Sequence, residues 1–153
     1  MTRLDYRYDE CGLENVILVG LEVCQDDEGE DVITIQNINA LHRAIAEGIA
    51  RKPSGINGRE LRFLRTELGF TQAELAAVIS KDVQTVGRWE RGEFPLDPTA
   101  DTVIRMLAFQ HTESAERIPA IEELAKWSVA SSGEPPFRID ATDPEHWRPL
   151  KAA

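Results

Sequence analysis

The residues whose types could do chemistry lie close together, between positions 83 and 88 of this 153-residue chain. Gln84 carries a hydrogen-bond donor and an acceptor that can meet an adenine edge, Arg88 can form a forked contact with guanine, and Val83 can touch a thymine methyl group. On a helix these residues and Gly87 share one face, which contains little that needs burial. Gly87 costs the helix about 1 kcal/mol relative to alanine, which favours either a close approach to DNA or tight packing. The pattern therefore favours recognition of base edges in a DNA groove.

Two short helices would have to position this face. Thr71 is suited to cap the first helix, and Glu74, three residues later, completes a capping box. Asp82 can cap the second helix, in which Val86 and Trp89 face inward. The first helix is expected to bury an apolar stripe made of Leu75, Ala76, Val78 and Ile79.

The segment from Phe70 to Gly92 resembles the helix-turn-helix of the lambda-repressor and Cro family, the XRE-type regulators of bacteria and phages. The matching residues are Gln72 to Ala76, Gln84 to Val86, Arg88 to Glu90, and Gly92. The resemblance implies that Gln72 grips a phosphate and supports Gln84. It also implies that Arg65, in the preceding helix, forms an ion pair with Glu90.

Two positions depart from that family's pattern. Ser80 stands where the family usually has glycine in the turn, and Lys81 stands where it often has an apolar residue. Lys81 could instead meet a phosphate, because it borders the second helix. The complete set of candidate DNA-binding residues is Thr71, Gln72, Lys81, Val83, Gln84, Thr85, Gly87, Arg88 and Arg91. The alternative is a helical fold of this type that is used for protein contact.

The charge of the chain is unevenly distributed. Its net charge is −10, which would repel a polyanion, but residues 1–50 carry −8, residues 51–97 carry +1 and residues 98–153 carry −3. The negative charge is thus separated from the proposed DNA surface, and the acidic flank suggests a second, basic partner. No window is apolar enough to span a membrane, and residues 1–10 lack a secretory signal, so we expect a cytoplasmic protein. Cys11 and Cys24 are then expected to be free thiols.

The pattern changes along the chain predict three segments in an α+β fold. Residues 1–55 form an acidic unit with a small N-terminal β-hairpin, whose strands run from Val16 to Val23 and from Val32 to Ile35. A helix capped by Asn39 follows the hairpin, and residues 51–55 form a linker. Residues 56–112 form a lambda-repressor-like all-α helix-turn-helix domain, which starts with a helix capped by Asn57 and ends with a helix from Thr99 to Phe109. Residues 113–153 form a C-terminal helical extension, from Pro119 to a stop at Gly133 and Pro135–Pro136, and a tail that docks on its own domain or across a dimer.

The segment from Tyr8 to Ile49 resembles the region before the helix-turn-helix in MqsA-type antitoxins. The resemblance rests on YDECGL, GLEV and DVITIQNINALHRAI. It implies an N-terminal part that binds a toxin and a helical part that binds the operator of its own genes as a dimer. The zinc pattern of that family is absent, because Cys11 and Cys24 stand thirteen positions apart without a C-x-x-C pair. We therefore predict no metal and no cofactor, and we interpret His42 as a surface or capping histidine.

Two functional classes follow from these patterns, and neither is enzymatic, since the chain has no phosphate-binding glycine loop, no H-E-x-x-H and no nucleophile motif. The first is a homodimeric repressor that binds a two-fold operator in double-stranded DNA. The second is an interaction protein whose acidic N-terminal unit neutralises a basic partner, such as a toxin that acts on RNA. An autorepressing antitoxin of a toxin–antitoxin pair combines both roles. A solitary phage-like repressor and a small-molecule effector stay open as alternatives.

Overall fold

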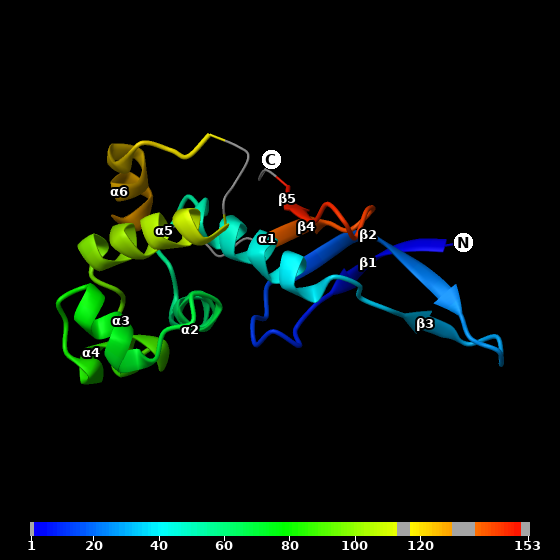
Figure 1. Cartoon of the computed structure of the whole chain (residues 1–153), viewed down its shortest axis with the longest axis horizontal. Helices are drawn as coiled ribbons and strands as arrows, with labels where there is room; N and C mark the ends of the chain where they lie inside the picture. The colour runs from blue at the N-terminus through cyan, green and yellow to red at the C-terminus, as the bar shows by residue number, and fades with distance from the viewer. Residues whose placement is uncertain (1, 113–116, 130–136, 151–153) are drawn as a thin grey trace.

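A sheet and a group of helices form the two parts of the molecule, and helix α1 (Ile38–Ala50) joins them (Figure 1). The computed structural model describes residues 2–112, 117–129 and 137–150. The strands are β1 (Thr2–Arg7), β2 (Val16–Gln25), β3 (Asp31–Ile33), β4 (Phe137–Asp140) and β5 (Arg148–Pro149). The remaining helices are α2 (Gly58–Glu67), α3 (Gln72–Val78), α4 (Val83–Glu90), α5 (Pro98–Thr112) and α6 (Ile121–Val129). Gly133 and Pro135–Pro136, the predicted stop of the C-terminal helix, lie outside the described residues.

Strand β2 is the centre of the sheet. It pairs antiparallel with β1 along one edge, and along the other edge it pairs parallel with β4 and antiparallel with β3. Its buried residues are Val16 and Leu18 in the first half and Leu21 and Val23 in the second, so the alternation shifts by one residue. Gly20, with φ +75°, lies at this shift, where β2 has one more residue than β1. A β-bulge at Gly20 therefore keeps both halves of the strand facing the core.

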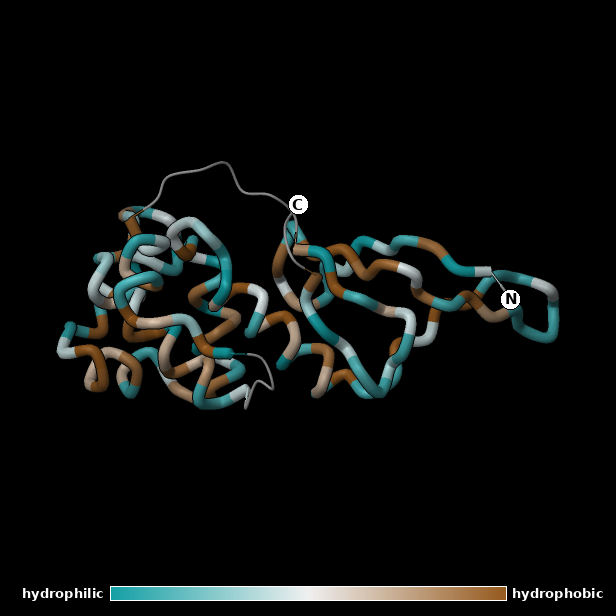
Figure 2. Tube along the Cα trace, turned by 90° about the horizontal axis from the view of Figure 1, so that it is seen from above, coloured by the Kyte–Doolittle hydropathy of each residue, from teal (hydrophilic) through white to brown (hydrophobic). Residues whose placement is uncertain are grey.

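The predicted hairpin is confirmed as β2 and β3, and the tail adds two strands, β4 and β5, that were not predicted from the sequence. Figure 2 shows the β2–β3 hairpin as a loop that extends away from the helical part. In the tail, β4 places Ile139 in the core, and the indole Nε1 of Trp147 donates to the carbonyl of Gln36 at 3.2 Å. The tail thus docks on the sheet of its own chain. β1 was also not predicted as a strand.

Helix α1 forms as predicted, but its start is different. Leu41, Ile45 and Ile49 are fully buried, as their spacing predicts. The N-cap residue is Asn37, not the predicted Asn39, and Asn37 has a left-handed backbone with no side-chain cap. Its side-chain amide donates instead to the carbonyl of Pro144, so a contact with the C-terminal tail replaces the local cap.

A polar cluster joins the sheet to the helices around His42. The Tyr8 hydroxyl lies 2.9 Å from Nε2 of His42, and burial raises the pKa of Tyr8 to about 12. Glu67 of α2 lies between two histidines. Its carboxylate is 3.9 Å from Nδ1 of His42 and 3.7 Å from Nε2 of His111 in α5. Burial lowers the pKa of His42, and Glu67 opposes this shift only in part. His42 is therefore a half-buried junction residue and not the predicted surface or capping histidine.

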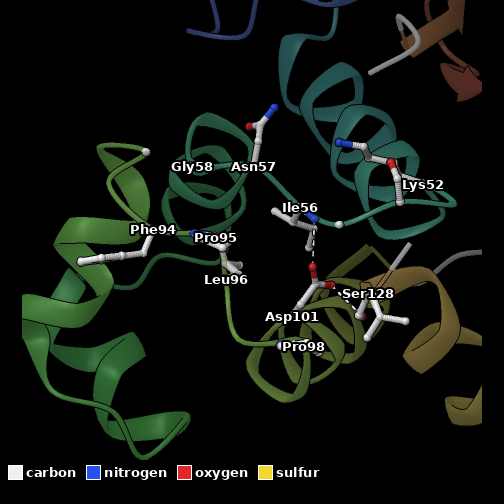
Figure 3. Close-up of a pocket in the computed structure, with 14 residues that line it drawn as sticks. Lys52, Ile56, Asn57, Gly58, Phe94, Pro95, Leu96, Pro98, Asp101 and Ser128 are labelled. Atoms are coloured by element: carbon white, nitrogen blue, oxygen red, sulfur yellow. Dashed lines mark hydrogen bonds between the residues drawn. The ribbon is translucent and has the colours of Figure 1, made fainter. Parts of the chain in front are cut away.

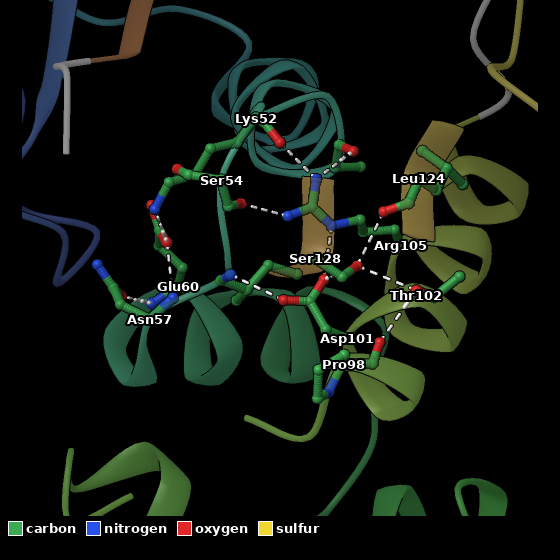
Figure 4. Close-up of polar contacts among 12 residues, drawn as sticks. Lys52, Ser54, Asn57, Glu60, Pro98, Asp101, Thr102, Arg105, Leu124 and Ser128 are labelled. Carbon is green, nitrogen blue, oxygen red and sulfur yellow. Dashed lines mark hydrogen bonds and ion pairs between the residues drawn. The ribbon is translucent and has the colours of Figure 1, made fainter. Parts of the chain in front are cut away.

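The predicted linker at residues 51–55 is anchored to the core around Arg105, with Lys52 and Ser54 buried (Figure 4). The Arg105 side chain is fully buried, and its guanidinium donates to the backbone carbonyls of Ala50, Lys52 and Ser54. Its Nε donates to Asp101 Oδ1 at 2.6 Å, and Asp101 also accepts from the Ser128 hydroxyl and from the Ile56 amide. A buried charge needs such a partner and such hydrogen bonds, and removal of either group would destabilise the fold. The Arg105–Asp101 pair therefore holds the segment between α1 and α2 against α5 and α6.

Candidate nucleic-acid interface

Helix α2 supports the two helices of the motif. Asn57 caps it, as the sequence predicts, and the structure adds a capping box with Glu60 that was not predicted. Gly58, the first residue of α2, lies against the end of α4: a Cβ there would stand 2.3 Å from the carbonyl oxygen of Trp89 and 2.8 Å from that of Glu90. Gly58 was not predicted from the sequence as a functional residue. A glycine directly after a capping asparagine looks like part of a turn, and only the fold reveals its neighbour.

Helix α3 begins as predicted, with Thr71 and Glu74 in a capping box. Leu75 and Ala76 are buried, but the side chain of Val78 is exposed, which corrects the predicted stripe. At 100° per residue Val78 lies about 60° outside the arc formed by the other three residues of the stripe, which accounts for its exposure. The turn that follows contains Ser80 with φ +57°, a left-handed conformation. This conformation explains why the resemblance places glycine at that position.

Helix α4 is capped by Asp82, as predicted. The Asp82 carboxylate accepts from the backbone amide of Thr85 at 3.0 Å and from its hydroxyl at 3.2 Å. These hydrogen bonds lower the pKa of Asp82. Val86 and Trp89 are buried beneath the helix, also as predicted. The opposite face of α4 is thereby turned to solvent.

That exposed face contains the residues proposed to recognise bases. Val83 is 45% exposed, and Gln84 and Arg88 are exposed as well. In the described parts of the chain, neither Gln84 nor Arg88 has a side-chain hydrogen bond or an ion pair. Gly87, in contrast, is buried: a Cβ there would stand 3.1 Å from the Arg91 guanidinium and 3.7 Å from the Gln72 side-chain oxygen. The glycine is thus explained by close packing within the motif.

An ion pair fixes the base of α4. Arg65 of α2 donates from Nε to Glu90 at 2.6 Å and from Nη2 at 3.1 Å, which confirms the pair that the resemblance implied. The Gln72 amide donates to the same carboxylate at 3.2 Å. Helices α2, α3 and α4 therefore share one partly buried carboxylate. A bidentate pair of this kind is rigid. The Gln72 side chain therefore points its amide nitrogen at the Glu90 carboxylate, within the motif.

Lys81 and Arg91, the two cationic residues proposed for phosphate contacts, are both paired with carboxylates. Lys81 Nζ lies 3.1 Å from Asp97, and Arg91 Nη2 lies 2.9 Å from Glu93. Both pairs are exposed to solvent. Asp97 and Glu93 were not singled out from the sequence, because neither carboxylate is spaced regularly from its cation.

A hollow of about 640 Å³ lies behind the motif (Figure 3). Its walls are the segment from Lys52 to Gly58, the segment from Gly92 to Pro98, and residues of α5 and α6. The charges in its wall are internally paired, since Lys52 lies 2.8 Å from the buried Glu60 and Asp101 binds Arg105. This region therefore serves to join the motif to the rest of the chain.

Comparison with known proteins agrees with this geometry. Residues 61–109 match the model of a family described as helix-turn-helix. The members of that family are DNA-binding regulators. The match therefore supports the interpretation of this chain as an XRE-like DNA-binding regulator. No curated protein and no solved structure matches the chain.

Three further findings concern the cysteines, metal binding and membrane-spanning segments. Cys11 and Cys24 are free thiols. Within the described ranges, no group of three or more His, Cys, Asp or Glu side chains is arranged to hold a metal ion. In those same ranges no helix is both long enough and apolar enough to cross a membrane.

Proposed function

We propose that this chain is a sequence-specific transcriptional repressor that binds its operator as a homodimer, with α4 in the major groove. The observation that carries the proposal is that Gln84 and Arg88 are exposed, and have no side-chain partner among the described residues, on a helix whose base is fixed by the Arg65–Glu90 pair. Gln84 is suited to an adenine edge, Arg88 to guanine and Val83 to a thymine methyl group. A two-fold dimer would place two copies of α4 in successive major grooves, about one helical turn apart.

The remaining candidate residues would position the helix on the DNA backbone. We assign phosphate contacts to Lys81 and Arg91, and to Gln72 on condition that its amide nitrogen turns from Glu90 to the DNA. We place Thr71 and Thr85 at the same surface, with the buried Gly87 beneath it as a packing residue. Contacts with phosphates set orientation and register, whereas base contacts supply the sequence preference. Substitutions in the two groups should therefore have different effects on specificity.

The test is a fluorescence anisotropy titration with the DNA upstream of the protein's own gene, in excess nonspecific competitor. Loss of Gln84 or Arg88 should each cost about 1–3 kcal/mol of discrimination between this DNA and competitor. Arg43→Ala is the matched control, because it removes an exposed arginine from α1 with the same change in charge. If Arg88→Ala binds as tightly and as selectively as the wild type, α4 does not recognise bases through this face.

A second function is supported by the charge of the β2–β3 hairpin. From Val16 to Ile33 this hairpin has six Asp and Glu residues and no Lys or Arg. The hairpin extends away from the helical part (Figure 1), and Glu22 and residues 26–31 are exposed. We propose that this hairpin binds a basic protein, and that the chain is an autorepressing antitoxin, as the resemblance to MqsA-type antitoxins suggests.

The second function is tested by coexpression with the small proteins encoded beside its gene. Asp27→Asn, Glu28→Gln and Glu30→Gln together should release a basic partner from the hairpin, while Asp26 is kept because it holds the turn amides of Glu28 and Glu30. The control changes Glu122, Glu123 and Glu145 to Gln, with the same gain in charge elsewhere. Equal recovery of the partner with both triple variants would argue against the hairpin, and a wild type that recovers no partner would leave the repressor as a solitary one.

A further inference from the structure

Asp97 holds Lys81 in a defined position. One carboxylate oxygen, Oδ1, accepts from the backbone amide of Thr99 at 3.2 Å, and the Asp97 carbonyl accepts from the amide of Asp101 at 2.9 Å, so Asp97 caps the start of α5. The other oxygen, Oδ2, lies 3.1 Å from Nζ of Lys81. Because the cap fixes the carboxylate, the ammonium group of Lys81 has a fixed anion beside it.

The same pairing recurs at the other end of α4. Lys81 precedes Asp82, the N-cap of α4, and Arg91 is its C-cap residue. Arg91 donates from Nε and Nη2 to one oxygen of Glu93, at 3.2 and 2.9 Å. Both ends of the recognition helix thus have a neutralised cation. Arg88, on the face between them, has no carboxylate within ion-pair distance among the described residues.

We propose that Asp97 sets the DNA affinity and specificity of this protein by holding Lys81, and that Glu93 has a lesser effect of the same kind by holding Arg91. This inference rests on the proposed DNA-binding function and deepens it. The carboxylates of Asp97 and Glu93 partly neutralise Lys81 and Arg91, the phosphate-binding groups at the ends of α4. They leave the base-recognising groups of Gln84 and Arg88 free, so sequence-independent binding is weakened more than sequence-specific binding.

The physical basis is counterion release. Each phosphate that a protein cation neutralises contributes about 0.9 to the slope of log K against log salt. A cation whose own carboxylate remains beside it neutralises the phosphate only in part, and the carboxylate itself repels the DNA. A unit charge pair at contact distance in water changes an equilibrium by about fivefold. Removal of the Asp97 charge should therefore tighten binding to random-sequence DNA by about 3- to 10-fold near 0.1 M salt and raise the slope by up to about 0.9.

The test uses Asp97→Asn in the full-length protein, with a random-sequence DNA duplex as the probe, over about 50 to 200 mM salt. Asparagine caps helices as well as aspartate does, so the thermal stability should stay at the wild-type value. Asp27→Asn is the matched control, because it makes the same change in net charge on the β2–β3 hairpin. Glu93→Gln should show a smaller effect than Asp97→Asn, since the Arg91–Glu93 pair is more exposed.

A double-mutant cycle adds a second measurement. Lys81→Ala should weaken random-sequence binding only slightly in the wild type, and several-fold more in the Asp97→Asn background. If Asp97→Asn and Asp27→Asn alter affinity and salt slope equally, net charge alone explains the effect and the inference is wrong. If the wild type binds neither random-sequence DNA nor its own upstream DNA, the proposed function is refuted, and this inference falls with it.

Discussion

Gly58→Ala tests how α2 supports the recognition helix. The new Cβ would stand 2.3 Å from the Trp89 carbonyl oxygen and 2.8 Å from that of Glu90. Carbon and oxygen normally stay about 3.3 Å apart, so one helix must shift by about 1 Å. The neighbouring atoms are backbone and cannot rotate away.

The expected cost of this shift follows from the behaviour of overpacked sites. Insertion of a methyl group into a filled space costs about 1–3 kcal/mol, and the gain in helix propensity from glycine to alanine returns at most about 1 kcal/mol. The net loss then reaches about 2 kcal/mol, and we expect Gly58→Ala to lower the Tm by about 4 to 8 °C. A shift of about 1 Å at α4 also exceeds the range of good hydrogen-bond distances, so operator affinity should fall by about tenfold or more.

Gly48→Ala is the control for this prediction. Gly48 also lies in a helix, and a Cβ there would meet Pro149 at 3.5 Å, an ordinary contact. This substitution should stabilise the protein by about 0.5–1 kcal/mol through helix propensity. Urea unfolding of the two variants and the wild type measures both effects. A Gly58→Ala protein as stable as the Gly48→Ala protein would refute the packing argument.

Three further predictions concern stability. Ser80→Gly should raise the free energy of unfolding by about 0.5–1 kcal/mol, because glycine adopts φ +57° without steric cost; a lower urea midpoint would contradict the strained turn. Arg105→Met should lower the free energy of unfolding by about 3–5 kcal/mol, because it leaves the Asp101 carboxylate buried without its partner; a loss below 1 kcal/mol would show that the network is dispensable. His42 has a pKa below its usual value in the folded state, so the unfolded chain takes up its proton first and stability should fall as the pH drops below about 6.5. His42→Gln should remove this part of the pH dependence in urea unfolding between pH 7 and 5, and an unchanged dependence would exclude His42 as its source.

The helix-turn-helix could be predicted in detail because its signals are local. Asn57, Thr71 and Asp82 cap helices through amides only three residues away, and sequence spacing alone reveals such partners. The inward Val86 and Trp89 follow from helical periodicity. The Arg65–Glu90 pair spans 25 residues and was predicted only through the resemblance to a known family.

The remaining features depend on contacts between distant parts of the chain. The pairing of β2 with β4 joins residues more than a hundred positions apart, and no local pattern specifies such a partner. Asn37 is the N-cap residue of α1 in place of Asn39, and its amide contacts the C-terminal tail. The segment at residues 51–55 has the composition of a linker, but Arg105 draws its carbonyls into the core. Long-range partners of this kind override local propensity.

The most direct test of the central claim is guanine N7 methylation protection on the DNA upstream of the gene. If Arg88 forms a fork with guanine in the major groove, the wild type should protect guanines in two half-sites about one helical turn apart. Arg88→Ala should lose this protection, and Arg43→Ala should keep it. Absence of protection by the wild type, or equal protection by the Arg88→Ala variant, would contradict recognition of DNA through α4.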